Sequence, residues 1–409
     1  MTKACYVGVA GKARKVKKIY TGVDNKARKV KKAYVGVGGV ARPFFSAEQK
    51  LSYYGTVTPL SVARTLLAAT FVGDYALFGG GNRNSYQSRV DAYSATLVRR
   101  TPTGLSQTRE DLAATAVGNY GLFAGGYDNR FEADTYRNTV DAYSATLVRS
   151  TPTALSQEKG SLAATTVGNY GLFGGGDIDS GYSDMVDAYS ATLVRSTPTA
   201  LSQEKGSLAA TTVGNYALFG GGAYGQRILS TVDAYTIFLV RSTPTPLSEA
   251  RFAFAATAIA GYALFGGGAT TSSITSKVDA YSASLVRTTP APLSQIRGNL
   301  AATTVGEYAL FGGGTYYTSK VDAYSASLVH TTPTPLSQGR DNLAATTVGG
   351  YGLFGGGEAQ TDFSSTVDAY TVDGGGSQLS KPDPSNPDPD GPEDLKPKPG
   401  GSVPEKTPP

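Results

Sequence analysis

The residue types that most often carry catalysis are scarce in this chain of 409 residues. It contains one histidine, His330, and one cysteine, Cys5. A zinc or copper centre draws on several such groups, and a single cysteine forms no disulfide within a chain. His330 also stands where comparable segments carry an arginine, for example Arg287, which indicates a repeat variant and not a metal ligand. We predict no catalytic residue, no bound metal and no cofactor.

Carboxylates are the remaining groups that could support catalysis. A glycoside hydrolase needs only two suitably placed carboxylic acids, and Asp177, Asp179 and Asp184 lie close together in one segment. The sequence contains no Gly-x-Ser-x-Gly elbow, no phosphate-binding loop and no zinc-ligand spacing. A carbohydrate-active enzyme is therefore a minor alternative, and the favoured function is binding without catalysis.

Tyrosines and charged residues gather in segments that vary between otherwise near-identical stretches. Residues 140–176 and 186–222 differ at one of 37 positions, whereas residues 177–185 and 223–231 differ at all nine. Surface loops also drift neutrally, but neighbouring connections have not drifted. We predict selected recognition, because rigid amphipathic aromatics mixed with polar residues are typical of antibody paratopes. The predicted contact residues are Tyr86, Tyr127, Arg130, Tyr136, Asp177, Tyr182, Tyr224, Arg227, Tyr316 and Tyr317.

A set of seven cations, one per repeated unit, is a second candidate. These inner cations are Arg64, Arg109, Lys159, Lys205, Arg251, Arg297 and Arg340. Each precedes an expected strand, so the repeat would place them in a ring, where like charges would attract an anionic group of a partner. Acidic neighbours such as Glu110, Glu158 and Asp341 would neutralise part of that charge. Both a ligand-binding role and a structural role stay open.

Both candidate sets belong to a repeat that determines the fold. Val-Asp-Ala-Tyr occurs seven times at spacings of 43 to 50 residues, and a Tyr-(Ala/Gly)-Leu-Phe-(Gly/Ala)-Gly segment precedes each copy. The composition, with 51 Gly, 26 Tyr and no Trp, favours short strands joined by tight turns. This period, with four strand-like runs per unit, predicts an all-β, seven-bladed β-propeller of four-stranded antiparallel blades.

The unit that follows Lys159 shows the pattern, with strands expected at residues 161–167, 170–173, 186–189 and 191–195. A cation before the first strand, a double glycine after the second and a tyrosine on the third resemble the kelch repeat, over residues 50–373. The unit differs where that family has a tryptophan, because Leu193-Val194 stands there. Galactose oxidase uses such a propeller, but its copper site needs two histidines, so the resemblance implies a non-catalytic propeller.

Composition divides the chain into three regions. Residues 46–373 form the expected propeller, and because the seventh unit lacks a fourth strand, we predict that residues 50–61 complete it and close the ring. Residues 374–409 are rich in proline and glycine with almost no apolar residues, which predicts a disordered tail. Residues 1–45 carry a net charge of +11 and repeat Tyr-x-Gly-Val every 14 residues, which predicts short basic β-hairpins.

The basic hairpins suggest an attachment function. Their repeated cations favour docking to a larger assembly over a merely solvated surface, and residues 1–45 resemble segments of tail-associated proteins of phages and prophages. The remaining chain is slightly acidic, so a nucleic-acid partner is not expected. No apolar run is long enough to span a membrane, and the positive residues follow the first apolar stretch, which argues against a signal peptide.

These features lead to one favoured function and one alternative. We expect a protein that is made in the cytoplasm and then released or built into a virion, and that binds a cell-surface glycan or protein through the variable loops. The alternative is an intracellular protein–protein interaction scaffold, the function of many kelch propellers. Finding the protein in virions or in culture supernatant would separate the two.

Overall fold

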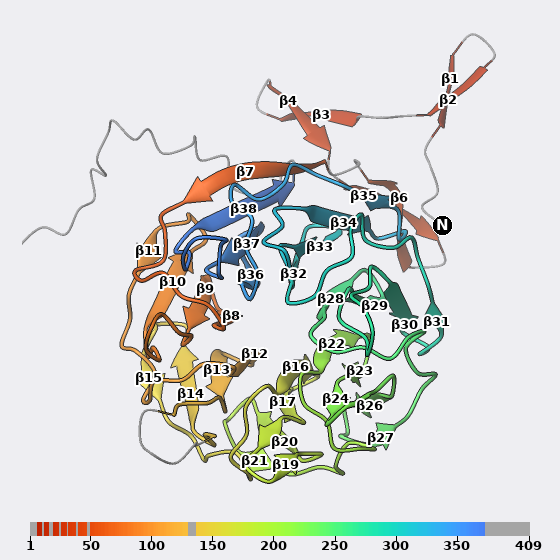
Figure 1. Ribbon diagram of the computed structural model, residues 1–409. Coiled ribbons are helices and arrows are strands. Elements are labelled where there is room, and N and C mark those ends of the chain that lie inside the picture. The colour runs from red at the N-terminus through yellow and green to blue at the C-terminus, as the bar shows by residue number, and fades with distance from the viewer. Residues whose placement is uncertain are drawn as a thin grey trace, which may run out of the picture. The chain divides into compact units, whose positions relative to one another are not determined.

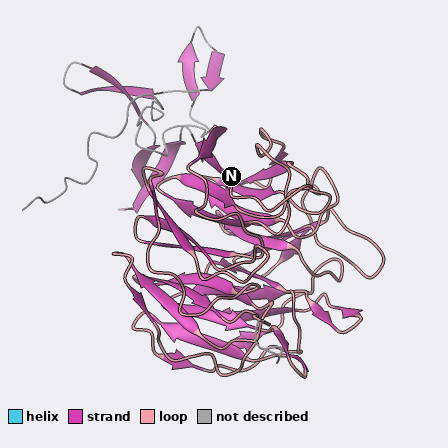
Figure 2. Cartoon of the chain, turned by 60° about the vertical axis from the view of Figure 1, so that its left-hand side comes forward, coloured by secondary structure: helices cyan, strands magenta, loops and turns pink. Residues whose placement is uncertain are grey.

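A computed structural model describes residues 50–129 and 136–372 in full and the strand backbones between residues 6 and 46. The described part consists of strands, turns and loops without helices, as Figure 2 shows. Four-stranded antiparallel sheets are arranged around a central axis as seven blades (Figure 1). The all-β, seven-bladed propeller predicted from the repeat is confirmed.

Each repeated unit provides the strands of one blade, numbered here from the axis outward. The first strands are β8 (Ala68–Val72), β12 (Ala113–Val117), β16 (Ala163–Val167), β22 (Ala209–Val213), β28 (Ala255–Ile259), β32 (Ala301–Val305) and β36 (Ala344–Val348). The second strands are β9 (Tyr75–Gly79), β13 (Tyr120–Ala124), β17 (Tyr170–Gly174), β23 (Tyr216–Gly220), β29 (Tyr262–Gly266), β33 (Tyr308–Gly312) and β37 (Tyr351–Gly355). The third strands are β10 (Val90–Ser94), β14 (Val140–Ser144), β20 (Val186–Ser190), β26 (Val232–Thr236), β30 (Val278–Ser282), β34 (Val321–Ser325) and β38 (Val367–Val372).

The fourth strands are shorter than the sequence suggested. They are β11 (Arg99–Arg100), β15 (Arg149–Ser150), β21 (Arg195–Ser196), β27 (Arg241–Ser242), β31 (Arg287–Thr288) and β35 (His330–Thr331). A strand was expected over residues 191–195, but a turn occupies residues 191–194, because Ser190 Oγ accepts hydrogen bonds from the backbone N–H groups of Thr192 and Val194. Such a serine-capped turn competes with strand pairing.

Residues near the N-terminus supply the fourth strand of the seventh blade. Strand β7 (Leu51–Val57) pairs antiparallel with β38, so segments from the two ends of the propeller lie side by side in one sheet (Figure 1). The Tyr53 hydroxyl also donates a hydrogen bond to the Asp368 carboxylate at 2.7 Å. The predicted closure of the ring is confirmed, and the outer edge of β38 is covered.

Small residues let neighbouring blades approach each other. A Cβ atom on Gly79 would lie 2.7 Å from the ring of Phe123 in the next blade, and one on Gly355 would lie 2.8 Å from Phe78, where the seventh blade meets the first. Such distances leave little room for a side chain, and the second blade has alanine, the smallest one, at this position as Ala124. The repeated Leu-Phe-(Gly/Ala) segment therefore packs the second strand of each blade against the next.

A closed ring of backbone hydrogen bonds surrounds the axis. One residue before each first strand has a positive φ and donates its N–H to the carbonyl of its counterpart in the preceding blade. In order the donors are Leu66, Asp111, Ser161, Ser207, Ala253, Asn299 and Asn342, and Leu66 donates to Asn342, which completes the circle. We infer that this ring fixes the spacing of the first strands at one face of the propeller.

The basic repeats form three antiparallel hairpins, as predicted. They pair β1 (Tyr6–Val9) with β2 (Lys12–Lys15), β3 (Ile19–Val23) with β4 (Lys26–Val30), and β5 (Lys32–Val37) with β6 (Val40–Ser46). The predicted disordered tail, residues 374–409, lies outside the described residues.

Candidate functional site

The inner cations lie inside the blades and not around the axis. All seven side chains are 0% exposed. Each pairs with the aspartate of Val-Asp-Ala-Tyr in its own blade, for example Arg109 with Asp141 at 2.6 Å and Lys205 with Asp233 at 2.9 Å. The sequence prediction that Arg64, Arg109, Arg251, Arg297 and Arg340 hold an anionic partner is therefore wrong, because these groups are out of reach of any ligand.

The same aspartate holds a second group on the outer side of the blade. In most blades this group is the arginine that opens the fourth strand, such as Arg241, whose Nη1 lies 3.0 Å from Asp233 Oδ1. His330 takes this place in the sixth blade, where its Nε2 lies 2.6 Å from Asp322 Oδ1. His330 is therefore a repeat variant, as predicted. Tyr53 takes the place in the seventh blade.

Desolvation explains why this arrangement is repeated. Burial lowers the pKa of the Arg251 guanidinium, and the charge of Asp279 opposes that shift. A charge buried without a partner is costly, so each blade requires both members of the pair. The tyrosine of the motif is structural too, because the Tyr281 hydroxyl donates to the backbone carbonyl of Thr245 at 2.8 Å.

The variable loops join the second and third strands, and their ends follow a fixed pattern. In most blades the residue after the double glycine bridges to the residue four positions before the valine of Val-Asp-Ala-Tyr, as Asp177 does to Tyr182 in β18 (Asp177–Ile178) and β19 (Gly181–Tyr182). The position four before the valine is always large and apolar or aromatic. It holds Tyr86, Tyr136, Tyr182, Ile228, Ile274, Tyr317 and Phe363.

Three of the predicted contact tyrosines therefore have a structural function. Tyr136 packs over Gly160 of the next blade, where a Cβ atom would lie 3.0 Å from its ring, and Tyr182 packs over Gly206 in the same way. Tyr86 occupies the same repeated position, and its ring lies against that of Tyr127 in the next blade. These three tyrosines seal contacts between blades, and only their outer surfaces remain for a ligand. Tyr317 occupies the position too, but it is 36% exposed and stays available for contact.

The remaining predicted residues divide by location. Tyr127 lies between Tyr86 and Tyr136, with ring centroids 6.0 and 5.4 Å apart. Tyr224, Arg227 and Tyr316 are exposed at loop tips, Tyr316 at 71%. Tyr316 and Tyr317 both have a positive φ, an unusual backbone state for bulky residues that holds Tyr316 outward. Arg130 lies outside the described residues.

The inner rim beside these loops is acidic. Asp111 belongs to the backbone ring, and burial, with the nearby charges of Glu110 and Asp177, raises its pKa to about 7. Burial and Glu358 raise the pKa of Asp341 to about 6. From the sequence, we expected acids such as Glu110 and Asp341 to neutralise part of the charge of the inner cations. In the structure, the aspartates of Val-Asp-Ala-Tyr neutralise these cations instead.

Replacing Asp111 with asparagine is expected to raise the melting temperature by about 2–4 °C at pH 8 and to leave it unchanged near pH 4. Asparagine already occupies the equivalent ring positions 299 and 342 with a positive φ, so the backbone accepts it. In the unfolded chain Asp111 ionises near pH 4, whereas in the folded protein it keeps its proton to about pH 7. Rising pH therefore destabilises the native protein across this interval, and asparagine removes that loss.

Thermal melts of both proteins between pH 4 and 9 measure this effect. A stability difference that does not change with pH would contradict it, because a purely steric effect of the substitution has no proton linkage.

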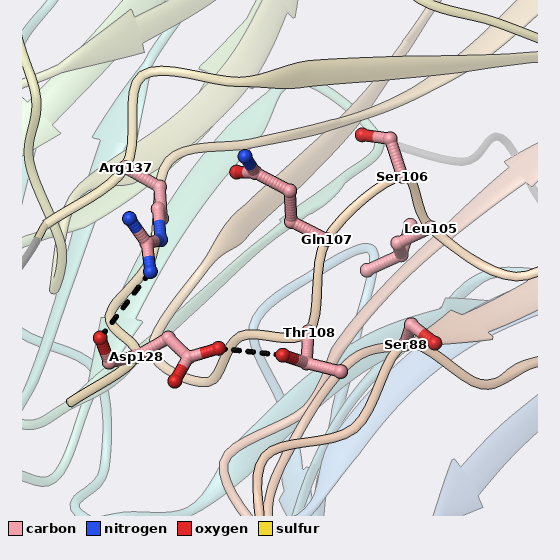
Figure 3. Close-up of a pocket in the computed structure, with 7 residues that line it drawn as sticks. All are labelled: Ser88, Leu105, Ser106, Gln107, Thr108, Asp128 and Arg137. Carbon is pink, nitrogen blue, oxygen red and sulfur yellow. Dashed lines mark hydrogen bonds between the residues drawn. The ribbon is translucent and has the colours of Figure 1, made fainter. Parts of the chain in front are cut away.

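Two hollows open on the variable-loop face. The first, of about 410 Å³, lies between the first and second blades and is lined by Ser88, Leu105, Ser106, Gln107, Thr108, Asp128 and Arg137. Figure 3 shows the Arg137 and Gln107 side chains in this lining, with Arg137 donating to the Asp128 backbone carbonyl and Thr108 donating to the buried Asp128 carboxylate. Its polar lining suits a hydroxyl-rich or acidic ligand.

The second hollow, of about 340 Å³, lies between the third and fourth blades. It is lined by Ile178, Ser180, Gly181, Tyr182, Glu204, Tyr224 and Gly225. Both volumes fall at the lower end of the range found for small-ligand sites. Tyr182 and Tyr224 were predicted contact residues, whereas Glu204, Gln107 and Arg137 were missed as lining residues.

The missed residues have a recognisable signal. In a four-stranded antiparallel blade, the connection from the fourth strand to the next first strand lies on the same face as the loop from the second to the third. Residues 105–108 and Glu204 belong to such connections. The sequence of these connections is similar in every blade, so a comparison that looks for variable segments does not select them.

The fold and its two hollows define a seven-bladed β-propeller whose variable loops form one face. Among solved structures it is similar to "Structure of YjhT", with a TM-score of 0.51 and 10% identity over 77% of this chain and 99% of that one. At this identity the likeness shows the fold alone. No family model matches the chain, and the comparison with curated proteins finds no match.

Two further findings concern the described residues only. No group of three or more histidine, cysteine, aspartate or glutamate side chains among them could hold a metal ion. Nor does any described segment form a helix long and apolar enough to cross a membrane.

Proposed function

We propose that this protein is a non-catalytic recognition protein that binds a cell-surface glycan or protein through the tips of its strand 2–3 loops. The observation that carries the proposal is that both hollows lie on the face where these loops emerge and are lined in part by them. The scaffold beneath is repeated almost without change, whereas the tips differ in every blade.

In most blades the two ends of the loop pair with each other and pack between blades. Selection for recognition would therefore act on the tip residues between these ends. In the third blade the tip is residues 178–181, Ile-Asp-Ser-Gly, and in the fourth it is residues 224–227, Tyr-Gly-Gln-Arg. Both tips join strands in two-residue turns of the same length. They differ in charge and aromatic content, as residues that face different parts of a partner would.

The basic hairpins would attach the propeller to a larger assembly. Their repeated cations and their resemblance to phage tail-associated segments support attachment to a virion, from which the propeller would reach a host cell surface. In this arrangement the kelch-like ring supplies a rigid platform and the loops supply specificity.

Exchanging residues 178–181 with residues 224–227 tests the proposal. The exchange keeps composition and net charge, and it leaves Tyr182 and Ile228 in their packed positions, so the melting temperature should move by no more than about 2 °C. Binding to a ligand found by glycan array or on intact cells should fall by about tenfold or more, because tip side chains would face the wrong part of the partner.

A tip chimera that melts and binds like the parent would mean that these loops drifted, and it would remove the main support for recognition at this face.

A further inference from the structure

The hollow between the third and fourth blades has two aromatic walls. Tyr182 is anchored over Gly206, and Tyr224 comes from β24 (Ala223–Tyr224), which pairs with β25 (Arg227–Ile228). The ring centroids lie 5.5 Å apart with an interplanar angle of 48°, so the rings are tilted and not stacked face to face. Tyr224 is 44% exposed. The walls therefore present π surface to whatever enters.

The same hollow has a carboxylate without a counter-ion. Glu204 is exposed, and no ion pair joins it to a cation in the described part of the chain. In the next connection Ala250 stands at the position of Glu204, and the acid one position earlier, Glu249, pairs with Lys277 at 3.6 Å. Arg227 is exposed on the tip hairpin but does not line the hollow. Glu204 thus offers a carboxylate without an ion-pair partner beside the two rings.

Aromatic faces and a carboxylate attract the same kind of ligand. The face of a tyrosine ring is electron-rich and favours a cation within about 6 Å of its centroid. A carboxylate adds a charge-assisted hydrogen bond to a guanidinium or ammonium group. The ring surfaces can also cover the apolar methylene stem on which such a group is carried. A neutral or anionic ligand would use only part of this lining.

We propose that this hollow binds the arginine or lysine side chain of a protein partner. The inference rests on the proposed function, of which it names the partner class: a protein that presents a cation, and not a neutral glycan. Tyr182 and Tyr224 pack against each other and form one aromatic surface, so the stem lies across that surface and the charged group meets Glu204. Because the hollow lies between two blades, the partner contacts both tips that the exchange above would swap.

A titration of the full chain with argininamide tests the site directly. The titration is monitored by NMR of protein with isotope-labelled tyrosines. Argininamide should bind with a dissociation constant in the roughly millimolar range and shift the resonances of Tyr182 and Tyr224. Citrullinamide, which has nearly the same shape and the same α-amino group but lacks the guanidinium charge, should bind at least about threefold more weakly. Raising the salt concentration should weaken argininamide binding.

The chain offers matched control variants. E204Q and Y224A should each weaken argininamide binding by about three- to tenfold. E158Q changes the equivalent glutamate of the preceding connection, and Y316A removes an exposed loop tyrosine elsewhere on the face, so both should leave binding unchanged. All four positions are exposed, and melting curves confirm that each variant is folded.

Equal binding of argininamide and citrullinamide, or an E204Q protein that binds like the parent, would overturn the proposed cation site. So would a neutral sugar, methyl glucoside, that binds at this hollow while argininamide does not. The two proposals fail separately. If argininamide behaves as expected but the tip exchange leaves cell-surface binding intact, recognition through the loops is wrong and the cation site stands.

Discussion

The variant Asp279→Asn is expected to lose about 3–5 kcal/mol of unfolding free energy, a large fraction of what holds a domain folded. Asp279 is fully buried and accepts from Arg251 Nη2 at 2.7 Å, from Arg287 at 3.2 Å and from the backbone N–H of Ser248. Asparagine keeps the shape but leaves the Arg251 guanidinium buried without a counter-ion. Chemical denaturation followed by circular dichroism measures the loss.

Two neighbouring substitutions separate charge pairing from general damage to the blade. Arg251→Lys should cost less than about 1.5 kcal/mol, because the third and fourth blades already use Lys159 and Lys205 at this position. Arg287→Ala removes the outer, partly exposed partner and should cost about 1 kcal/mol or less. If Asp279→Asn proves no more harmful than Arg287→Ala, the buried pair is not what stabilises the blade.

The fold was predictable because every blade repeats the residues that build it. Seven copies of Val-Asp-Ala-Tyr place seven third strands, and the Leu-Phe-(Gly/Ala) segment before each places the second strand and its contact with the next blade. The ring closure was predictable for a similar reason. One unit lacked a fourth strand, and residues 50–61 offered one with no other place to pair.

The ion-pair partners of the inner cations could not be predicted from their neighbours in the sequence. Arg251 stands beside Glu249 in the chain, but its guanidinium reaches Asp279, 28 residues away. That pairing depends on the sheet register, in which Phe265 lies opposite Asp279, and Arg251 Nη2 also donates to the Phe265 carbonyl. A charged side chain that precedes a strand can point along the surface or back under the sheet. The register between the strands determines which of these directions places it beside a partner.

The loop tyrosines were partly predictable. Aligning the loops on the valine that follows them brings Tyr136 and Tyr182 onto the same position as Ile228 and Phe363, which indicates packing and not recognition. No such alignment predicts the hollows, because each is built by side chains of two different blades. Gln107 and Arg137, for example, line the same hollow although they are 30 residues apart in the chain.

Deleting β7 is expected to have the other large effect, because this strand is the fourth strand of the seventh blade and ties the two ends of the propeller into one sheet. A chain that starts at residue 58 loses the pairing of β7 with β38, the Tyr53 hydrogen bond to Asp368 and the edge contact of Tyr54 with Tyr351, whose ring centroids lie 5.2 Å apart. The exposed outer edge of β38 is then free to pair with another molecule. We expect aggregation, or a melting temperature lower by about 10 °C or more in whatever stays monomeric.

A chain that starts at residue 50 is the matched control, because it lacks the basic hairpins but keeps β7. It should melt like the full protein, which would assign the whole effect of the shorter chain to this strand. A synthetic peptide of residues 50–57 should restore part of the lost stability in proportion to its concentration, since a strand that binds only the folded ring shifts the unfolding equilibrium by mass action. If the chain from residue 58 instead stays monomeric with an unchanged melting curve, the hydrogen bonds and packing of the inner strands suffice to hold the ring, and β7 merely covers its edge.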